Sequence, residues 1–199
     1  VGMAFTCSPP YVAPYGGKRR MFGTNPMAFG WPRTDGKPAM IFDQASSHSA
    51  RGEVMIMARD GHEAPIGAGV DVDGNPTTDP NAILKGAQST FGGYKGSAIA
   101  LMVDLMAGPL IGELTSLGIE AEDDGSGPAL GGELIIAFDP LRLGGAGSIE
   151  AGEALLAELE GEDGVRLPGA RRAGNRVTTP ETGIDVPTSL YETIKGFIR

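Results

Sequence analysis

The segments of this sequence that could do chemistry are polar or basic loops that follow apolar stretches. Residues 43–53 form the densest of them, because eight of the eleven side chains are polar and the loop follows an expected strand. Loops at strand ends are where ligands sit in α/β proteins. Thr24 and Asn25 place a hydroxyl and an amide in a tight turn, where they either bind a ligand or cap the backbone. These groups suit hydrogen bonding to a small polar ligand.

Two basic segments favour an anionic ligand. Lys95 comes just before an expected helix, whose free N–H groups and dipole attract phosphate. The loop 168–172 carries Arg171 and Arg172, whose guanidinium groups suit paired hydrogen bonds to phosphate. Seven of the 16 Lys and Arg residues lie within 18–20 and 166–176. Local anion sites are one explanation of this clustering, and ordinary solvated surface charge is the alternative.

The common motifs for nucleotide, metal and nucleophile chemistry are absent. Gly67–Gly69 and Gly145–Gly147 begin like dinucleotide fingerprints, but Val72 and Glu150 stand where the third glycine is required. Neither a Walker A sequence nor a G-x-S-x-G nucleophile elbow occurs. Two histidines and one cysteine are too few for a zinc site made by this chain alone. A resident metal and a Rossmann fold are therefore not expected.

Composition narrows the class of protein. The 199 residues include 32 glycines and 15 prolines, and 41% are hydrophobic, which predicts a folded domain with many tight turns. A net charge of −9 argues against a nucleic-acid partner. The single cysteine cannot form an internal disulfide, which favours a reducing, cytoplasmic compartment. No apolar run approaches the roughly 20 residues of a membrane span, so no membrane partner is expected.

Four segments are predicted to be strands. Residues 27–31 and 39–43 flank a turn around Asp35 and Gly36, which predicts a hairpin. Residues 1–6 are predicted to form another strand that ends in a loop. Residues 134–139 are a continuous apolar run, which predicts a central strand covered on both faces.

Five segments are predicted to be helical. They span 47–59, 79–88, 97–117, 148–160 and 187–198, with Asp79 and Ser148 as caps. The 97–117 helix is apolar on most sides, which places it in the centre of the fold with a kink at Gly108-Pro109. Residues 120–132 and 166–179 are expected to be an acidic and a basic loop. Because helices and strands mix without a βαβ repeat, the expected fold class is α/β in the mixed, α+β sense.

Several short motifs recur in the same order in one enzyme family. They are Thr24-Asn25-Pro26 with Ala28-Phe29-Gly30, Ala50-Arg51-Gly52-Glu53, Pro76-Thr77-Thr78-Asp79-Pro80, Phe91-Gly92-Gly93-Tyr94-Lys95-Gly96, and Pro168-Gly169 with Arg171. On these motifs the chain resembles the malate/L-lactate dehydrogenase family of NAD(P)-dependent oxidoreductases, which lacks the Rossmann fold. Within that family, Gly30-Trp31-Pro32-Arg33 and the loop at Asp43 look most like Δ1-piperideine-2-carboxylate/Δ1-pyrroline-2-carboxylate reductases. The resemblance covers essentially the whole sequence.

The resemblance implies a non-Rossmann nicotinamide-binding domain with a mixed β-sheet flanked by helices. It also implies a homodimer whose active site lies near the subunit interface. The implied reaction is reduction of the C=N bond of a cyclic imino acid by NADPH, with NADH as the other cofactor to consider. A 2-hydroxy-acid dehydrogenase of the same family, acting on an oxo acid, and a non-catalytic nucleotide-binding fragment are the alternatives.

The resemblance also assigns roles to individual residues. The implied cofactor-binding positions are Thr24, Asp43, Gln44, Ala45, Tyr94, Lys95, Pro168, Gly169, Ala170, Arg171 and Arg172. A substrate contact is implied at or beside Ser46, and a charge-relay carboxylate at Glu53. From the residues alone, Glu53 equally suits a salt bridge on a helix face, and His48 suits a surface or loop-anchoring role better than catalysis.

The proton donor of the family has no counterpart in this sequence. The family's proton-donating histidine lies in an N-terminal helical region that residues 1–199 do not match. We therefore expect this chain to be the NAD(P)-binding domain plus the C-terminal helical part of a larger reductase, with the N-terminal catalytic helical segment missing. On this expectation the chain alone binds NADPH weakly and turns over little substrate, because an acid must protonate the reduced group.

Overall fold

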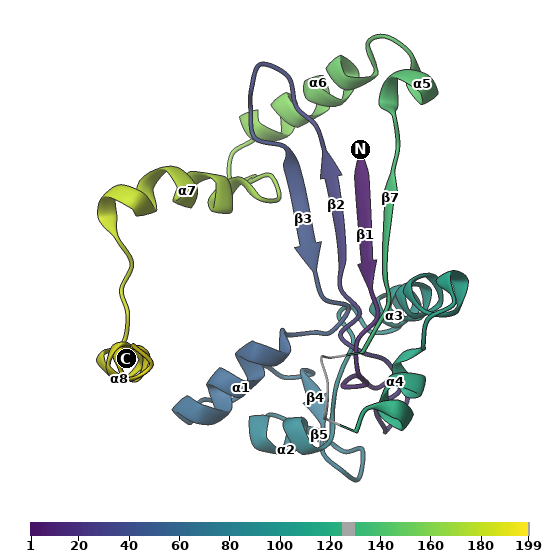
Figure 1. Cartoon of the computed structure of the whole chain (residues 1–199), viewed down its shortest axis with the longest axis vertical. Coiled ribbons are helices and arrows are strands. Elements are labelled where there is room, and N and C mark those ends of the chain that lie inside the picture. The colour runs from purple at the N-terminus through teal and green to yellow at the C-terminus, as the bar shows by residue number, and fades with distance from the viewer. Residues whose placement is uncertain (125–129, 199) are drawn as a thin grey trace. The chain divides into compact units, whose positions relative to one another are not determined.

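The computed structural model describes residues 1–124 and 130–198. It divides the chain into two compact units, which we describe separately. Unit 1 comprises Val1–Trp31 and Ile41–Gly145, and unit 2 comprises Pro32–Met40 and Ala146–Arg199. The expected mixed α+β class is confirmed, and Figure 1 shows the order of the elements along the chain.

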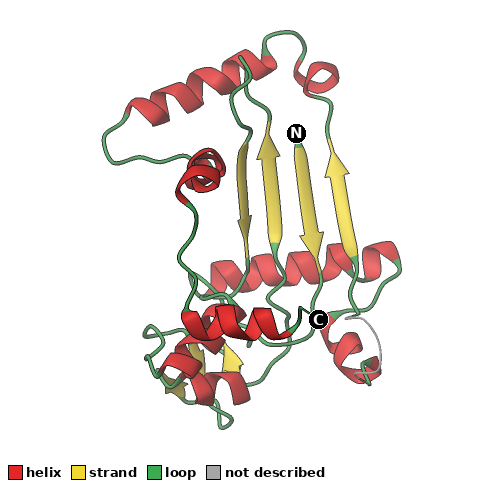
Figure 2. Ribbon diagram, turned by 60° about the vertical axis from the view of Figure 1, so that its left-hand side comes forward, coloured by secondary structure: helices red, strands yellow, loops and turns green. Residues whose placement is uncertain are grey.

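The main sheet of unit 1 has four strands. In spatial order they are β3 (Met40–Gln44), β2 (Met27–Trp31), β1 (Gly2–Thr6) and β7 (Glu133–Ala137). Strand β1 pairs antiparallel with β2 on one side and with β7 on the other, so that Met3 lies opposite Phe29 and Ile136. Figure 2 shows the four strands side by side. The predicted strand 1–6 and the adjacent pair 27–31 and 39–43 are confirmed.

The prediction of a central strand at 134–139 is wrong. Strand β7 lies at the edge of the sheet and pairs only with β1 among the described strands. Leu134 and Ile136 pack against the core, whereas Ile135 is 69% exposed on the opposite face. A continuous apolar run indicates a strand, but it does not decide whether both faces are covered.

The predicted central helix is broken. Helix α3 (Tyr94–Ala107) ends at Gly108, the turn η1 (Pro109–Ile111) follows, and helix α4 (Ser116–Glu122) occupies the beginning of the expected acidic loop. Gly108 adopts a non-helical backbone just before a proline, which ends the helix where a kink was expected. The remainder of that expected loop falls partly on 125–129, outside the described residues.

Helix α3 is buried on one face only. Val103 and Ala107 pack with Phe5, Cys7 and Ile119 in the larger core of unit 1. Leu101 and Leu105 on the other face are 46% and 50% exposed. The expectation of a fully buried helix is therefore wrong for this face.

One helical stretch of the described residues is long and apolar enough to cross a membrane. It runs from Tyr94 to Ile111 with a mean hydropathy of 1.2, and it contains the charged residues Lys95 and Asp104. A core helix of a folded domain passes the same test of length and composition, and this one contributes Val103 and Ala107 to the core. The stretch is therefore weak evidence for a membrane span.

A second, smaller sheet completes unit 1. Its strands are β5 (Pro76–Thr77), β4 (Gly69–Val70) and β6 (Ala87–Gln88), and helices α1 (Arg51–Asp60) and α2 (Pro80–Lys85) adjoin it. Val54, Ala64, Ala68 and Ile83 form its core. Both helices are shorter than predicted, and β6 replaces the predicted end of α2. The predicted cap is confirmed, since the Asp79 carboxylate accepts the Asn81 N–H at 2.9 Å.

Unit 2 is mainly helical. Its helices are α6 (Ser148–Gly161), α7 (Ala170–Thr182) and α8 (Thr188–Gly196), whereas α5 (Pro140–Gly144) ends unit 1. The basic loop expected at 166–179 is wrong, because most of it is helix α7. Gly174 and Pro180, which usually discourage helix, lie inside α7. Gly147, not Ser148, is the N-cap of α6.

Candidate functional site

Three loops of unit 1 are joined at one end of the main sheet. The Ser46 N–H donates to the Thr24 carbonyl at 2.7 Å, and the Phe91 N–H donates to the Ser46 carbonyl at 3.1 Å. The His48 N–H donates to the Ser89 carbonyl at 2.8 Å. The structure thus brings together the turn at Thr24, the loop after β3 and the glycine-rich segment before α3.

A cavity of about 400 Å³ lies beside these loops in unit 1. Five glycines line it, together with Tyr15, His48, Ser89 and Thr90 among others; the glycines are Gly16, Gly17, Gly67, Gly92 and Gly93. Its volume falls within the usual range for small-molecule sites. Glycine walls leave backbone amides accessible at close approach, which suits a flat or phosphate-bearing ligand. His48, for which a surface or loop-anchoring role was expected, is exposed and lies on the wall of this cavity.

Tyr94 and Lys95 open helix α3 at the edge of this region. Both are exposed, and the rings of Tyr94 and Tyr15 meet edge to face with centroids 6.2 Å apart. Gly93 lies under Tyr15, because a Cβ there would stand 3.1 Å from the ring. Among the described residues no salt bridge involves Lys95. Its charge stands at a helix N-terminus, where anions are favoured.

Residues 43–46, at the end of β3 and just after it, become progressively more buried along the chain. Asp43 and Gln44 are exposed and Ala45 is half-buried, whereas Ser46 is 1% exposed. The Ser46 hydroxyl donates to the Asn25 carbonyl at 2.7 Å. Its hydrogen is therefore committed to holding the loop, and a substrate contact at or beside Ser46 stays a prediction.

Glu53 has a local partner. It lies in the first turn of α1 and is exposed, and its Oε2 accepts the Ala50 N–H at 3.2 Å. This bond satisfies one of the backbone donors at the helix start. The expected salt bridge on the helix face does not occur among the described residues, and the charge-relay role stays a prediction.

A buried polar cluster behind the loops was not foreseen. Asp104 accepts hydrogen bonds from Asn25 Nδ2 at 2.9 Å, from the Ser116 hydroxyl at 2.6 Å and from the Ser116 N–H at 3.0 Å. Asn25 also holds the loop before β2, in a left-handed backbone conformation with φ of 36°. A signal was present in the sequence, because Asp104 is the only charged residue between Lys95 and Glu113.

Cys7 borders this cluster. Its Sγ lies 3.5 Å from the Ser116 hydroxyl, and burial raises the pKa of the thiol from 9.0 to about 11. Such a thiol is unreactive at neutral pH, so Cys7 is a packing residue.

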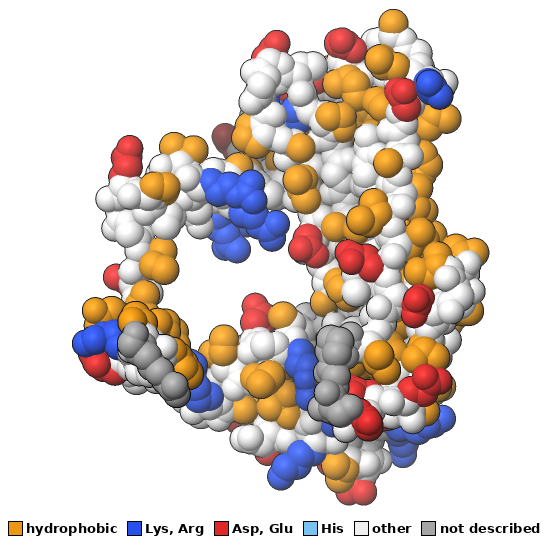
Figure 3. All heavy atoms as spheres, in the orientation of Figure 1, with side chains coloured by type: hydrophobic (Ala, Val, Ile, Leu, Met, Phe, Trp, Pro, Cys, Tyr) orange, Lys and Arg blue, Asp and Glu red, His pale blue; other side chains and the backbone are white. Residues whose placement is uncertain are grey.

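The remaining predicted cofactor residues belong to unit 2. Gly169 is the N-cap of α7, Ala170 is its first residue, and Arg171 and Arg172 follow in the first turn. Arg171, Arg172 and Arg176 line a groove of about 660 Å³ along α7 with Asn175, Thr179 and Pro180. Figure 3 shows Lys and Arg side chains gathered on this helix. Among the described residues, none of these three arginines has a salt-bridge partner.

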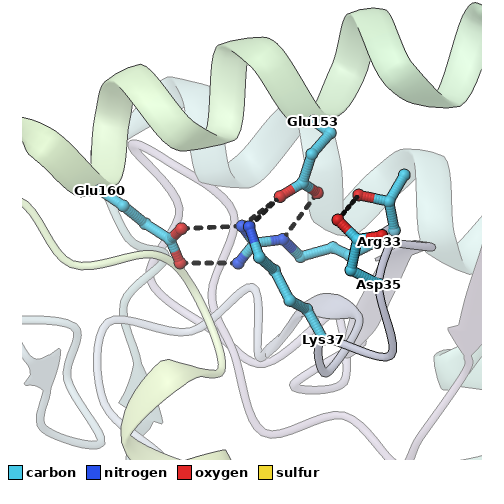
Figure 4. A network of polar contacts seen from close by, with 6 residues as sticks. Arg33, Asp35, Lys37, Glu153 and Glu160 are labelled. Atoms are coloured by element: carbon cyan, nitrogen blue, oxygen red, sulfur yellow. Dashed lines mark hydrogen bonds and ion pairs between the residues drawn. The ribbon is translucent and has the colours of Figure 1, made fainter.

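Pro168, Gly169 and Ala170 line a separate pocket of about 210 Å³ in unit 2. Arg33 stands on its wall, bound by Glu153 at 2.8 Å and by Glu160 at 2.6 Å, and Lys37 also binds Glu153 (Figure 4). Hydrogen bonds from Arg33 and then Lys37 lower the pKa of Glu153 from 4.5 to about 2. These paired charges hold the turn at 32–40 on α6, which gives Arg33 a structural role.

Comparison with known proteins agrees with the motifs. The family model of malate/L-lactate dehydrogenase matches residues 1–195. The Δ1-pyrroline-2-carboxylate/Δ1-piperideine-2-carboxylate reductase of Pseudomonas aeruginosa is 49% identical over all of this chain and 60% of its own length. The crystal structure of Δ1-piperideine-2-carboxylate reductase from Pseudomonas syringae pv. tomato matches with a TM-score of 0.86 and 39% identity, over 98% of this chain and 60% of that one.

A third relative acts on another substrate. The (2R)-3-sulfolactate dehydrogenase (NADP(+)) of Chromohalobacter salexigens is 38% identical over 99% of this chain and 59% of its own length. The chain thus spans about 60% of the length of the relatives it matches.

Proposed function

Because the chain belongs to the malate/L-lactate dehydrogenase family, we propose that it is the cofactor-binding part of an NAD(P)H-dependent imino-acid reductase. The proposed substrates are Δ1-pyrroline-2-carboxylate and Δ1-piperideine-2-carboxylate, which would give L-proline and L-pipecolate. The observation that carries this proposal is the 49% identity, along the whole chain, to a reductase named for both substrates. Bound NAD(P)H would supply a hydride to the imine carbon.

The glycine-lined cavity of unit 1 supports a dinucleotide ligand. A Cβ at Gly16 or Gly67 would meet nothing within 4 Å, so the backbone at both positions is open on that side. A planar ring can therefore approach the chain closely there, as it does in other cofactor sites built from glycine. At about 400 Å³ the cavity suits one end of a dinucleotide better than the whole molecule.

Cations support the phosphate contacts of the proposed site. We assign Lys95, at the start of α3, to a cofactor phosphate in unit 1. We assign Arg171 and Arg172, on α7, to cofactor phosphates in unit 2, because guanidinium groups suit phosphate and these two have no salt-bridge partner among the described residues. Three arginines on this helix also favour NADPH, with its additional 2′-phosphate, over NADH.

Smaller roles follow for the other predicted residues. Thr24, Asp43, Gln44 and Ala45 are proposed to contact the cofactor, and the hydrogen bond from the Ser46 N–H to the Thr24 carbonyl joins the two loops that carry them. Glu53 is proposed to orient a proton donor, since it is exposed and held by the Ala50 N–H. We further propose a homodimeric, cytoplasmic enzyme, in keeping with the family resemblance and the bacterial relatives.

A 2-hydroxy-acid dehydrogenase is the second candidate. The 38% identity to a sulfolactate dehydrogenase favours it, although the identity to the imino-acid reductase is higher. Both reactions need hydride transfer beside a bound carboxylate, so the cofactor site alone does not separate them.

A substrate panel tests the proposal. The protein as its gene encodes it would be assayed for NADPH and NADH oxidation with the two cyclic imino acids, pyruvate, oxaloacetate and 3-sulfopyruvate. We expect the highest kcat/KM with an imino acid and NADPH. A higher kcat/KM with any of the oxo acids would contradict the imino-acid assignment. Absence of NADPH and NADH binding in an equilibrium titration would contradict the oxidoreductase assignment as a whole.

A further inference from the structure

A second basic segment, 18–20, is not used by the proposed reductase site. With Lys85 it lines a pocket of about 300 Å³ in unit 1, between the turn at 71–75, the end of α2 and α4. Four cations, Lys18, Arg19, Arg20 and Lys85, line this pocket against two carboxylates, so its lining carries a net charge of +2. The whole chain carries −9. The pocket lining is thus positively charged although the whole chain is negatively charged.

Arg20 is fixed in place rather than loose on the surface. Its Nε donates to the Gly86 carbonyl at 2.5 Å, and its Nη2 donates to the Leu84 and Lys85 carbonyls at 2.7 and 2.8 Å. These are the carbonyls at the end of α2, where a cation is favoured. The hydrogen bonds account for the position of Arg20, but they do not neutralise its charge.

Lys18 is also held by its surroundings. Its aliphatic chain lies directly over Gly74, where any Cβ would collide with it. Packing of the aliphatic stem keeps the ammonium group at the pocket while costing little side-chain entropy on binding. Lys18 and Arg20 thus give the pocket two walls that are formed before any ligand binds.

The two carboxylates leave much of this positive charge unmatched. Asp71 Oδ1 accepts from the Asp73 and Asn75 N–H groups at 3.0 and 2.9 Å, which lowers its pKa and ties it to its own turn. Glu120 lines the pocket from α4. Among the described residues, no salt bridge involves Lys18, Arg19, Arg20 or Lys85. Grouped like charges repel one another, and an anion would relieve that repulsion.

We propose that this pocket binds the phosphate group of a small phosphorylated molecule, at a site separate from the glycine-lined cavity and from α7. Lys18, Arg19 and Lys85 are exposed, and of these Arg19 and Lys85 would contact the anion directly. Lys18 and Arg20 provide the fixed positive walls. The size of the pocket fits a phosphate or pyrophosphate group rather than a whole dinucleotide.

Inorganic pyrophosphate is the probe, titrated at low salt with the amide signals of the 15N-labelled protein as the readout. Low salt is needed because exposed charges are screened within about 10 Å at 0.1 M. We expect the Gly74 and Gly86 amides to shift and saturate together. These signals separate the pocket from any anion binding on α7, which has its own amides.

Three variants sharpen the test. Arg19→Gln/Lys85→Gln should weaken binding at the Gly86 amide by about fivefold or more. The matched control, Arg59→Gln/Arg142→Gln, removes the same charge from exposed, paired cations of the same unit and should leave the affinity unchanged. Glu120→Gln should tighten binding by about twofold, because it removes a negative charge from the lining. A misfolded variant would not produce this gain.

Three results would overturn the proposal. One is no saturable shift at Gly74 and Gly86 with pyrophosphate. Another is an equal loss of affinity in the control variant. The third is the same saturating shifts on addition of NADPH, because the pocket would then belong to the cofactor site. None of these outcomes depends on reductase activity, so they test the phosphate site without testing the imino-acid assignment.

Discussion

The buried carboxylate of Asp104 provides the sharpest test of how the loops of unit 1 are held. Asp104 is 4% exposed and accepts three hydrogen bonds, from Asn25 Nδ2 and from the hydroxyl and N–H of Ser116. Replacing it with alanine leaves these donors inside the protein without their acceptor. The loop at Thr24, the loop at Ser46 and the start of α4 all depend on this cluster.

The expected cost follows from the donors that cannot find another partner. Asn25 Nδ2 keeps its bond to the Ala100 carbonyl, and the Ser116 hydroxyl lies 3.4 Å from Asn25 Oδ1 as a weaker acceptor. The Ser116 N–H has no such substitute among the described contacts. At about 1–3 kcal/mol for each buried donor left unsatisfied, Asp104→Ala should lower the free energy of unfolding by about 2–4 kcal/mol.

Urea unfolding followed by fluorescence measures this cost. Trp31, the single tryptophan, lies in β2 and therefore reports on unit 1. The matched control is Leu105→Ala, the next residue of α3, which is 50% exposed and should lose less than about 1 kcal/mol. If Asp104→Ala costs no more than Leu105→Ala, the cluster does not hold the loops and the reasoning is refuted.

Three further predictions concern other parts of the chain. Because burial raises its pKa to about 11, Cys7 should form about 100-fold less thiolate at pH 8 than a thiol at its ordinary value of 9.0, so Ellman's reagent should label it only after denaturation. Glu153 has a pKa lowered to about 2, so its contribution to unit 2 is present above 4.5 and fades as the pH falls towards 2. Glu153→Gln, unlike Glu158→Gln on the same helix, should flatten this acid transition in circular dichroism. Gly96→Ala should lower the melting temperature, because its Cβ would collide with the Phe91 carbonyl oxygen, whereas Gly52→Ala, with open space around it, should not.

Short-range sequence signals predicted several turns and helix starts correctly. The turn at Asp35 and Gly36 has positive φ at both residues, 55° and 70°, as the Asp-Gly pair predicts. The Asp79 cap with Pro80 at the first helical position located the start of α2. Family membership was equally readable, because short motifs carry residue identities that do not depend on knowing the fold.

Two predictions failed because glycine, proline and apolar runs each occur in more than one kind of structure. Gly174 and Pro180 favour a loop, yet both lie inside α7. The apolar run of β7 predicts burial on both faces, yet Ile135 faces outward at the sheet edge. Strand order is set by pairing between distant segments, which no local pattern reports.

Residue types and short-range spacing were enough to predict the family, the candidate loops and the four strands of the main sheet. Which loops meet depends on contacts between distant segments, so it became known only from the folded chain. Asn25 and Asp104 are 79 positions apart, and their contact exists only because α3 packs against the sheet. Lys18 is a second example. In the sequence it is indistinguishable from an ordinary surface lysine, whereas in the fold it lines the same pocket as Lys85. Side chains can act on the same ligand only when folding brings them close together. Their separation along the sequence does not predict their separation in space.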